Sequence, residues 1–473
     1  MKRFALKMRY ILFASFFVPL PILLFIRPDF NFFNDFFYLE MINNGSYIRN
    51  LSKVIFSEEL EQGFFTPLRF ILESTQYIIV SDNPLLLLFL NSIICTSIIF
   101  LFMIYTKKMG ITQSYYSVTG LLILTFLWPW TLDLYVFAGT VEKYLLLVLI
   151  VSIISISSPF KSKVSENLYF FIQFIILTLG LSLRIQFAAF IPGLFYYMIS
   201  LHRTNYRKII LLIIIPVFVE IALLLIIFSQ GSYTKKNFFE IQYHFLNLKA
   251  NLAYYPNYIF YLALISILIL HIYTFCSKKM LGSTPELNLF FLLIMTYSLA
   301  LIMWGELGFH LSVLGVLIGI YIILVFNWKN YQFFNSNWLI RIMAVTGLIL
   351  CLLFSIFKYY FSLTPPSTLR EFFTSNTFRE LNSMHNSFII PCEEPYARMY
   401  DFASRSDAEI KARFIYINSQ RDIDSLHSSN QIFMISNNSY CPIDFNLFNT
   451  YALIPIWNST RLNSYQVYRI NNK

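Results

Sequence analysis

The chain has 473 residues, of which 57% are hydrophobic, 19% aromatic and only 13% charged. Soluble globular domains carry about 25% charged residues, so this composition excludes a soluble globular enzyme and favours a membrane protein with many spans. The net charge of +10 does not indicate a nucleic-acid partner, because the basic residues lie between apolar runs and form no clustered basic face.

Apolar runs predict the transmembrane helices, each of which needs about 20 apolar residues. The stretch 168–200 is too long for one span, and we divide it at Gly180–Arg184 because an arginine is costly in the middle of a bilayer. The pattern predicts an all-α polytopic membrane domain over residues 1–361. Its eleven expected spans are residues 10–26, 85–105, 113–130, 144–159, 168–183, 185–200, 209–229, 257–276, 288–304, 311–327 and 342–361.

Lysine and arginine residues in the short loops predict the orientation of the chain. If the N-terminus is cytoplasmic, the cytoplasmic segments hold 15 basic residues and the short outward loops hold 5, Lys143 among them. The cytoplasmic loops are too short for a catalytic site, and 22 of the 25 acidic residues fall on outward segments. We therefore expect a cytoplasmic N-terminus, an outward C-terminus and chemistry at the outer face.

Two outward segments are large, namely the first loop (27–84) and a C-terminal tail (362–473). A helical start at Thr368–Asn382 precedes four tail segments in which apolar and polar residues alternate, as in β-strands. These segments are Arg413–Asn418, Gln431–Ser436, Tyr451–Trp457 and Tyr465–Ile470. The tail is therefore predicted to be a small extracytoplasmic α/β domain.

The tail contains two cysteines, Cys392 and Cys441. Because the tail is expected to face an oxidising compartment, we predict that they form a structural disulfide, with two unpaired thiols as the alternative. Elsewhere the histidines and cysteines show no metal-site spacing, so we predict no metal and no cofactor.

The first outward loop carries Asp35 and Glu40, which lie shortly after the first apolar run and on either side of Tyr38. Aromatic residues surround them and favour the membrane–water interface, where a lipid-linked substrate could reach the carboxylates. In a helix, five residues turn the chain by about 140°, so one acid would act on the substrate and the other would orient it. The alternative is an interfacial helix whose acids face water.

Two arginines are candidates for binding phosphate, because a guanidinium stays charged and donates hydrogen bonds in a fork. Arg69 follows Pro67-Leu68 in the first loop, and Arg184 interrupts a long apolar stretch at its outward end. The alternatives are a snorkelling side chain at Arg69 and a topological stop at Arg184. Glu306 and His310, on another outward loop, are candidate substrate contacts together with Tyr38.

These features resemble the GT-C glycosyltransferases, with acids after the first helix, a Pro-Leu pair before the second and an outward C-terminal domain. In the protein-mannosyltransferase branch the loop carries adjacent Asp-Glu, an aromatic residue and a His-Pro-Pro-Leu-like stretch. The counterparts here are Asn34-Asp35, Tyr38 and Thr66-Pro67-Leu68, so that Asn34 replaces the first acid. Over the whole chain the architecture is most similar to the serotype-converting O-antigen glucosyltransferases of Gram-negative bacteria and their phages.

The resemblance implies an inverting hexosyltransferase of the bacterial inner membrane, with its C-terminal domain in the periplasm. It would move glucose from undecaprenyl-phosphate glucose onto O-antigen repeat units, with Asp35 or Glu40 as the base and Arg69 and Arg184 on the lipid phosphate. A small flippase and a lipid-charging glucosyltransferase would accompany it. Two alternatives stay open: an O-antigen polymerase or ligase, and a transporter of polyprenyl-linked glycans.

Overall fold

The structure is a computed structural model, and the chain forms two compact units. One unit holds the described helices up to residue 327, and the other holds the described residues from 371 onward. The described residues are 12, 16, 66–80, 83–108, 134, 141–157, 163–202, 206–230, 245–246, 249, 258–276, 285–304, 311–327, 353, 371–383, 387–390, 411–415, 420–426, 431–436, 448–458 and 465–472.

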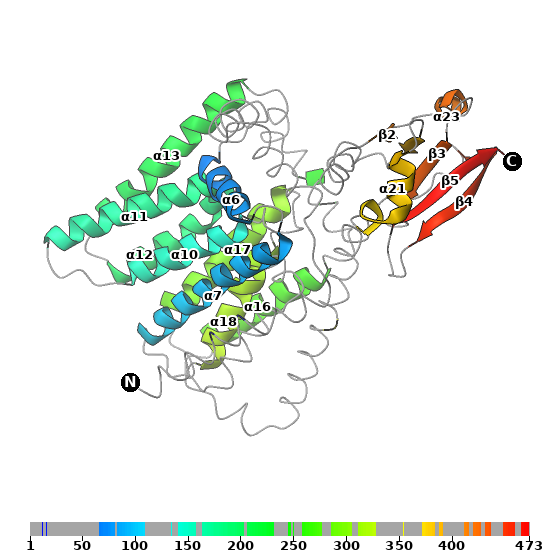
Figure 1. The fold of residues 1–473 in the computed structure, drawn as a ribbon. Helices are drawn as coiled ribbons and strands as arrows, with labels where there is room; N and C mark the ends of the chain where they lie inside the picture. The colour runs from blue at the N-terminus through cyan, green and yellow to red at the C-terminus, as the bar shows by residue number, and fades with distance from the viewer. Residues whose placement is uncertain are drawn as a thin grey trace. The chain divides into compact units, whose positions relative to one another are not determined.

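The first unit is helical (Figure 1). Its elements are α6 (Pro67–Val80), α7 (Pro84–Lys108), α10 (Glu142–Ile156), α11 (Lys163–Leu183), the 3-10 helix η2 (Ile185–Phe190), α12 (Ile191–Leu201), α13 (Tyr206–Gln230), α16 (Tyr258–Cys276), α17 (Pro285–Trp304) and α18 (Leu311–Asn327). Helix α10 packs against α7 and α11, and α17 packs against α12 and α18. Asn83 caps the start of α7, because its Oδ1 accepts hydrogen bonds from the backbone N–H groups of Leu85 and Leu86.

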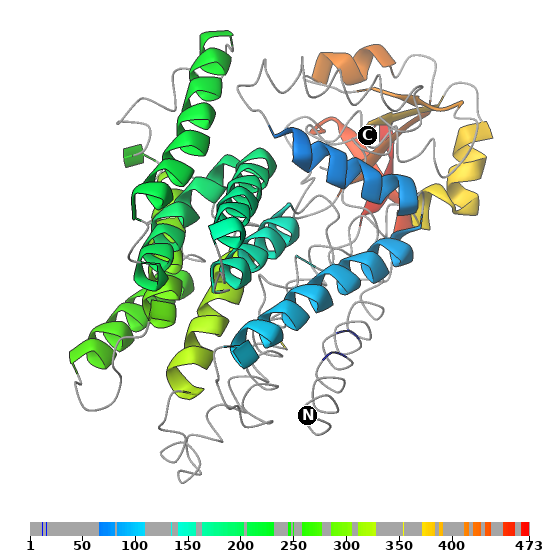
Figure 2. The ribbon, with the colours of Figure 1, turned by 90° about the vertical axis from the view of Figure 1, so that its left-hand side faces the viewer.

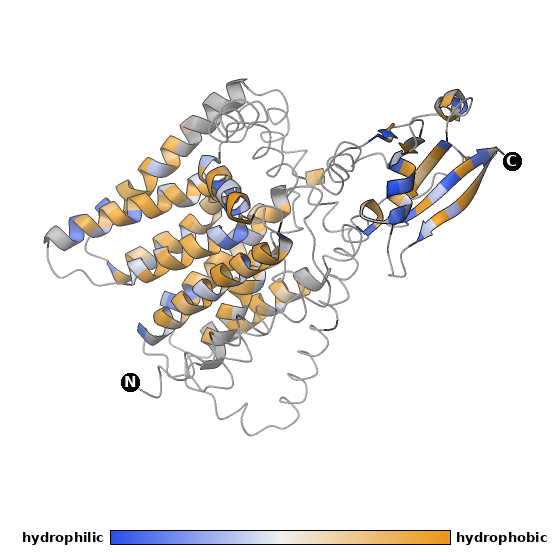
Figure 3. Cartoon of the chain, viewed as in Figure 1, coloured by the Kyte–Doolittle hydropathy of each residue, from blue (hydrophilic) through white to orange (hydrophobic). Residues whose placement is uncertain are grey.

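The helices of this unit are apolar on the outside as well as in the core (Figure 3). The exposed fractions of Phe171, Phe218 and Leu262 are 60%, 69% and 64%. Within the described residues, three stretches are long and apolar enough to cross a membrane: Leu85–Thr106, Glu166–Leu183 and Pro285–Ile302. These features support a location in a membrane. The total of eleven spans includes runs outside the described residues and stays a prediction.

Helix α11 ends at the break that the sequence indicates. Leu183 is its last residue, and Arg184 is extended, with φ −164° and ψ 133°. The ring of Phe187 packs directly against Gly180 at this break. A Cβ atom on residue 180 would lie only 2.5 Å from the ring. Phe187 is fully buried, so only glycine fits at position 180 while this ring keeps its place.

The second unit contains a five-stranded sheet in the order β2–β1–β3–β5–β4. Strand β1 pairs in parallel with β2 and β3, whereas β5 pairs antiparallel with β3 and β4. The elements are α21 (Asn376–Ser383), β1 (Ser387–Ile390), β2 (Arg413–Phe414), α23 (Gln420–Leu426), β3 (Gln431–Ser436), β4 (Tyr451–Asn458) and β5 (Gln466–Asn472).

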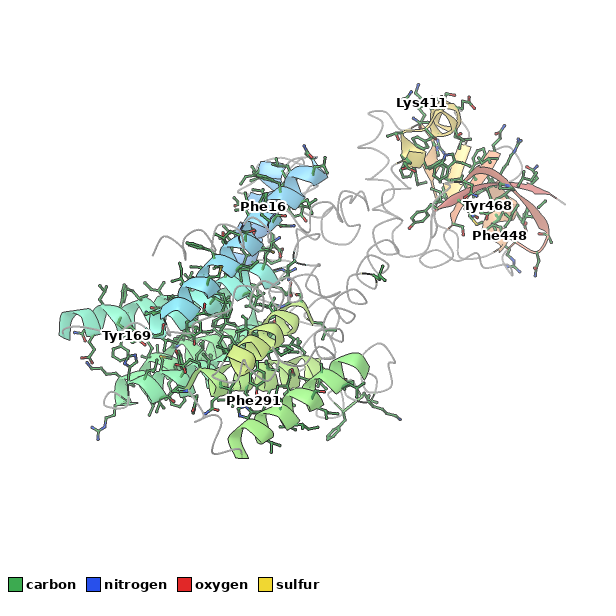
Figure 4. The ribbon with its side chains drawn as sticks, turned by 90° about the horizontal axis from the view of Figure 1, so that it is seen from below. Phe16, Tyr169, Phe291, Lys411, Phe448 and Tyr468 are labelled. Atoms are coloured by element: carbon green, nitrogen blue, oxygen red, sulfur yellow. The ribbon has the colours of Figure 1, made fainter. Side chains whose placement is uncertain are left out.

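Apolar side chains pack on both faces of this sheet. On one face Phe372 lies against Trp457, with ring centroids 5.2 Å apart, and Phe373 against Phe414, at 6.2 Å. On the other face Tyr451 donates a hydrogen bond to Asp424 of α23, which fixes this helix to β4. The core of that face consists of Ile423, Ile432, Met434, Phe448, Tyr451 and Ile470 (Figure 4).

Each of the four predicted strand segments contains an observed strand, although β2 covers only Arg413–Phe414. The alternation does not predict β1, because Ser387-Phe-Ile-Ile is a continuous apolar run. Such runs are typical of a strand between two parallel neighbours, which is the position of β1. The domain boundary at residue 362 stays a prediction.

We predict that Gly180→Ala lowers the thermal stability of the detergent-purified protein. The new methyl group must displace the buried Phe187 ring, and overpacking of this kind costs about 1–3 kcal/mol. Unfolding followed by tryptophan fluorescence measures the loss, with Leu179→Ala at the neighbouring, exposed position as the control. Equal unfolding temperatures for Gly180→Ala and the native chain would contradict this packing.

Candidate functional site

A network of polar side chains joins α6, α7 and α10 at one end of the helical unit. Asn91 Oδ1 accepts two hydrogen bonds of 2.6 Å each, from Gln76 Nε2 and from Lys143 Nζ. Tyr144 donates its hydroxyl proton to Gln76 Oε1 over 2.8 Å. Gln76, Asn91 and Lys143 are buried, and Tyr144 is half-buried. We call these four residues the amide network.

Two ion pairs lie on the helices that form the amide network. On α6, Arg69 Nε lies 3.2 Å from both carboxylate oxygens of Glu73. On α10, Glu142 Oε1 accepts a hydrogen bond of 2.5 Å from Arg184, whose Nε also donates to Gln186. Glu73 lies one turn before Gln76 on α6, and Glu142 directly precedes Lys143 on α10. We call the two ion pairs and the amide network together the polar site.

The two arginines of this site are more accessible than their carboxylate partners. The side chains of Arg69 and Arg184 are 26% and 14% exposed, whereas those of Glu73 and Glu142 are 0% and 2% exposed. Among the described residues, the site holds three cations, including Lys143, and two carboxylates. This arrangement favours an anionic ligand, which would meet the guanidinium groups first.

Helix α6 has its polar side turned inward and its apolar side turned outward. It lies beside the beginning of α7 (Figure 2). Its buried residues include Glu73 and Gln76, whereas its exposed face consists of Ile71, Thr75, Ile78 and Ile79. Thr75 donates its hydroxyl proton to the Ile71 carbonyl over 2.6 Å, so this face offers no unsatisfied polar side chain. Such a face suits contact with acyl chains rather than water.

A second polar cluster lies at the other end of α7 and joins it to α12 and α17. The hydroxyl oxygens of Tyr105 and Tyr197 are 3.3 Å apart, and Tyr197 donates to Glu286 over 3.5 Å. Tyr169 lies near this end and packs against His202, with ring centroids 5.3 Å apart (Figure 4).

The two clusters lie at opposite ends of α7, because the 14 residues from Asn91 to Tyr105 span about 21 Å. Between them the buried residues of α7 from Cys95 to Met103 are apolar. The neighbouring helices do bury polar side chains between the two ends, since Ser152 of α10 donates a hydrogen bond of 3.5 Å to Gln173 of α11.

Two of the residues singled out from the sequence lie in the polar site. Arg69 lies on α6 and Arg184 at the break between α11 and η2. Neither carboxylate partner was identified from the sequence: Glu73 lies four residues after Arg69, and Glu142 lies far from Arg184 in the chain. The other candidates lie outside the described residues, and their roles stay predictions: Asp35, Tyr38, Glu40, Glu306, His310, Cys392 and Cys441. Within the described part of the chain, no group of three His, Cys, Asp or Glu residues comes together to hold a metal ion.

Sequence reasoning missed the amide network. It treated Lys143 only as a charge in an outward loop, whereas the structure has Lys143 on the first turn of α10 and fully buried. The signals were present in the printed sequence. Asn91 interrupts an apolar run, and Glu142-Lys143 directly precedes another.

Comparisons with known proteins give weak likenesses. No family model matches the chain, and no curated protein matches it significantly. A crystal structure of ArnT from Cupriavidus metallidurans in the apo state is similar at a TM-score of 0.47 and 10% identity. A crystal structure of the same protein bound to undecaprenyl phosphate is similar at 0.48 and 11%. Both alignments cover 99% of this chain and 98% of the other. Function must therefore be argued from the residues of this chain.

We predict that Asn91→Leu destabilises the protein more than Asn91→Leu combined with Lys143→Met. The single substitution removes an acceptor from a buried ammonium group, at about 1–3 kcal/mol or more, whereas the pair removes the ammonium as well. Thermal unfolding in detergent measures both variants. If the double variant unfolds at a lower temperature than Asn91→Leu, Lys143 does not depend on Asn91.

Proposed function

We propose that this chain is a membrane glycosyltransferase that takes a sugar from a polyprenyl-phosphate carrier at the periplasmic face of the bacterial inner membrane. In its most specific form, our proposal is that the chain transfers glucose from undecaprenyl-phosphate glucose onto O-antigen repeat units. One observation carries the proposal: three cations lie at one end of apolar helices, on the inner side of a helix whose outer face is apolar.

The cations suit the phosphate of the donor. When the bond between sugar and phosphate breaks, negative charge develops on the phosphate oxygens. Positively charged groups that are already oriented stabilise this charge strongly in a site of low dielectric constant. The side chains of Arg69 and Arg184 are held by Glu73 and Glu142 and are still partly exposed, and we propose that they bind the phosphate.

The outer face of α6 suits the lipid chain of the donor. Ile71, Ile78 and Ile79 are 43%, 45% and 54% exposed. An exposed apolar face next to buried charges is expected where a helix borders the acyl region of a membrane. A polyprenyl chain could remain in that region while its phosphate enters the polar site, so the donor need not leave the bilayer.

The catalytic base of this proposal rests on the sequence alone. The acceptor hydroxyl must lose a proton as it attacks the anomeric carbon, and a carboxylate within about 3 Å serves as the general base. Asp35 or Glu40 would fill this role, and a single displacement would invert the anomeric configuration.

We predict that a Gram-negative bacterium expressing this chain adds about one hexose to each O-antigen repeat. The reason is that the proposed enzyme modifies the repeat and leaves its polymerisation unchanged. Mass spectrometry of the lipopolysaccharide measures the addition, and Asp35→Asn or Glu40→Gln should abolish it at normal protein levels in the membrane.

Other outcomes of this experiment separate the alternatives. An unchanged repeat mass with altered chain length would replace the proposal by a polymerase. If neither the repeat mass nor the chain length changes, O-antigen is not the acceptor. If both acid variants transfer hexose fully, neither Asp35 nor Glu40 is the general base.

We predict that neutralising the Arg184–Glu142 pair lowers kcat/KM for the lipid-linked donor by about 100-fold. The variant Arg184→Gln with Glu142→Gln avoids a buried unpaired charge, so its loss would reflect the missing cation. Transfer by the purified protein in nanodiscs measures the effect. The matched control is Lys208→Gln, because Lys208 pairs with Glu166 at 2.8 Å at the opposite end of the helices. Native activity in a stably folded double variant would show that Arg184 does not contact the donor phosphate.

A further inference from the structure

The hydrogen bonds of the amide network all have a fixed direction. An ammonium group can only donate, so the atom of Asn91 that faces Lys143 must be the oxygen. Gln76 contacts the same oxygen, and it must therefore present its NH₂ group there. This orientation turns Gln76 Oε1 toward Tyr144, and the tyrosine hydroxyl must donate its proton to that oxygen. Lys143 thus sets the direction of every bond up to Tyr144.

The consequence for Tyr144 is that its hydroxyl can only accept further hydrogen bonds. Its single proton is used by Gln76, and among the described residues no donor reaches its oxygen. Tyr144 is also the only half-buried member of the network, whereas Gln76, Asn91 and Lys143 are buried. The oxygen is therefore an acceptor on the one residue of the network that is partly exposed.

The surroundings of Tyr144 indicate what it would accept from. Gln76, its partner, lies one helical turn after Glu73, so the two side chains are neighbours on one face of α6. Glu73 pairs with Arg69. In the proposed donor the sugar is bonded directly to the phosphate, so a phosphate held by Arg69 would bring sugar hydroxyl groups, which are donors, close to Tyr144.

We infer that Tyr144 is a specificity residue that accepts a hydrogen bond from one hydroxyl group of the donor sugar, and that Lys143 is the positioning residue that keeps Tyr144 an acceptor. This inference rests on the proposed function. A sugar lacking that hydroxyl would leave the tyrosine oxygen without its partner, and the enzyme would discriminate against it.

The test compares undecaprenyl-phosphate glucose with its 2-, 3-, 4- and 6-deoxy analogues as donors for the purified full-length protein in nanodiscs. The native chain should use one deoxy analogue about tenfold less well than glucose, as expected for the loss of one hydrogen bond. Tyr144→Phe should use glucose about tenfold less well and should no longer discriminate at that one position. Lys143→Met should lose the same discrimination, because Tyr144 is then free to donate as well as accept.

Tyr196→Phe is the matched control. Tyr196 is half-buried on α12, and its hydroxyl accepts a hydrogen bond of 2.7 Å from Asn288 of α17. This variant loses the same chemical group outside the polar site and should keep the native discrimination.

The outcomes separate the inference from the function on which it rests. If the native protein transfers none of the sugars, the proposed function fails. If it transfers glucose and Tyr144→Phe discriminates among the analogues as the native chain does, Tyr144 is not the acceptor. If Tyr144→Phe loses the discrimination and Lys143→Met keeps it, Lys143 does not set the direction of the network.

Discussion

The buried ammonium group of Lys143 is the constraint on which the rest of the polar site depends. A charge inside an apolar helical unit is stable only if its hydrogen bonds are made, and here Asn91 supplies the acceptor from the middle of an apolar run. The same oxygen also accepts a hydrogen bond from Gln76, and this bond joins α6 to α7. Once Gln76 faces inward, so does Glu73, and the isoleucines of α6 are left outside. The inward polar side and the outward apolar side of α6 thus depend on one acceptor atom, Asn91 Oδ1.

A surrounding membrane would also favour the inward orientation of the polar side chains. A polar side chain that faces acyl chains is penalised, so charged residues on apolar helices turn toward one another. Glu73 and Glu142 illustrate this, because both carboxylates are buried and each is paired with an arginine. Breaking one member of such a pair is strongly destabilising, whereas removing both can be nearly neutral. For this reason an experiment on these residues needs paired substitutions to separate a catalytic role from a folding role.

The sequence predicted what depends on periodicity and on the cost of burying charge. The break at Arg184 and the positions of β3, β4 and β5 follow from such local patterns. The partner of Arg184 does not, because its pairing with Glu142 depends on how two helices pack. The pair Arg69–Glu73 has the i,i+4 spacing of a helix, and it was missed because residues 67–80 lie in the segment predicted as the first outward loop. Lys143 was misjudged for a related reason: a lysine beside an apolar run can equally lie in the loop before it or on the first turn of the helix. Only the contact with the Asn91 amide shows that Lys143 lies on the helix and is buried.

The difference in exposure between cations and carboxylates determines how an anion could bind. Under the proposed function, a phosphate would approach the partly exposed side chains of Arg69 and Arg184, while the enclosed carboxylates of Glu73 and Glu142 hold these cations in place. Cations that are already oriented stabilise developing negative charge with little reorganisation. A site of this kind favours ligands that carry a compact negative charge on an apolar anchor, since the charge is drawn inward while the outer face of α6 accommodates the anchor.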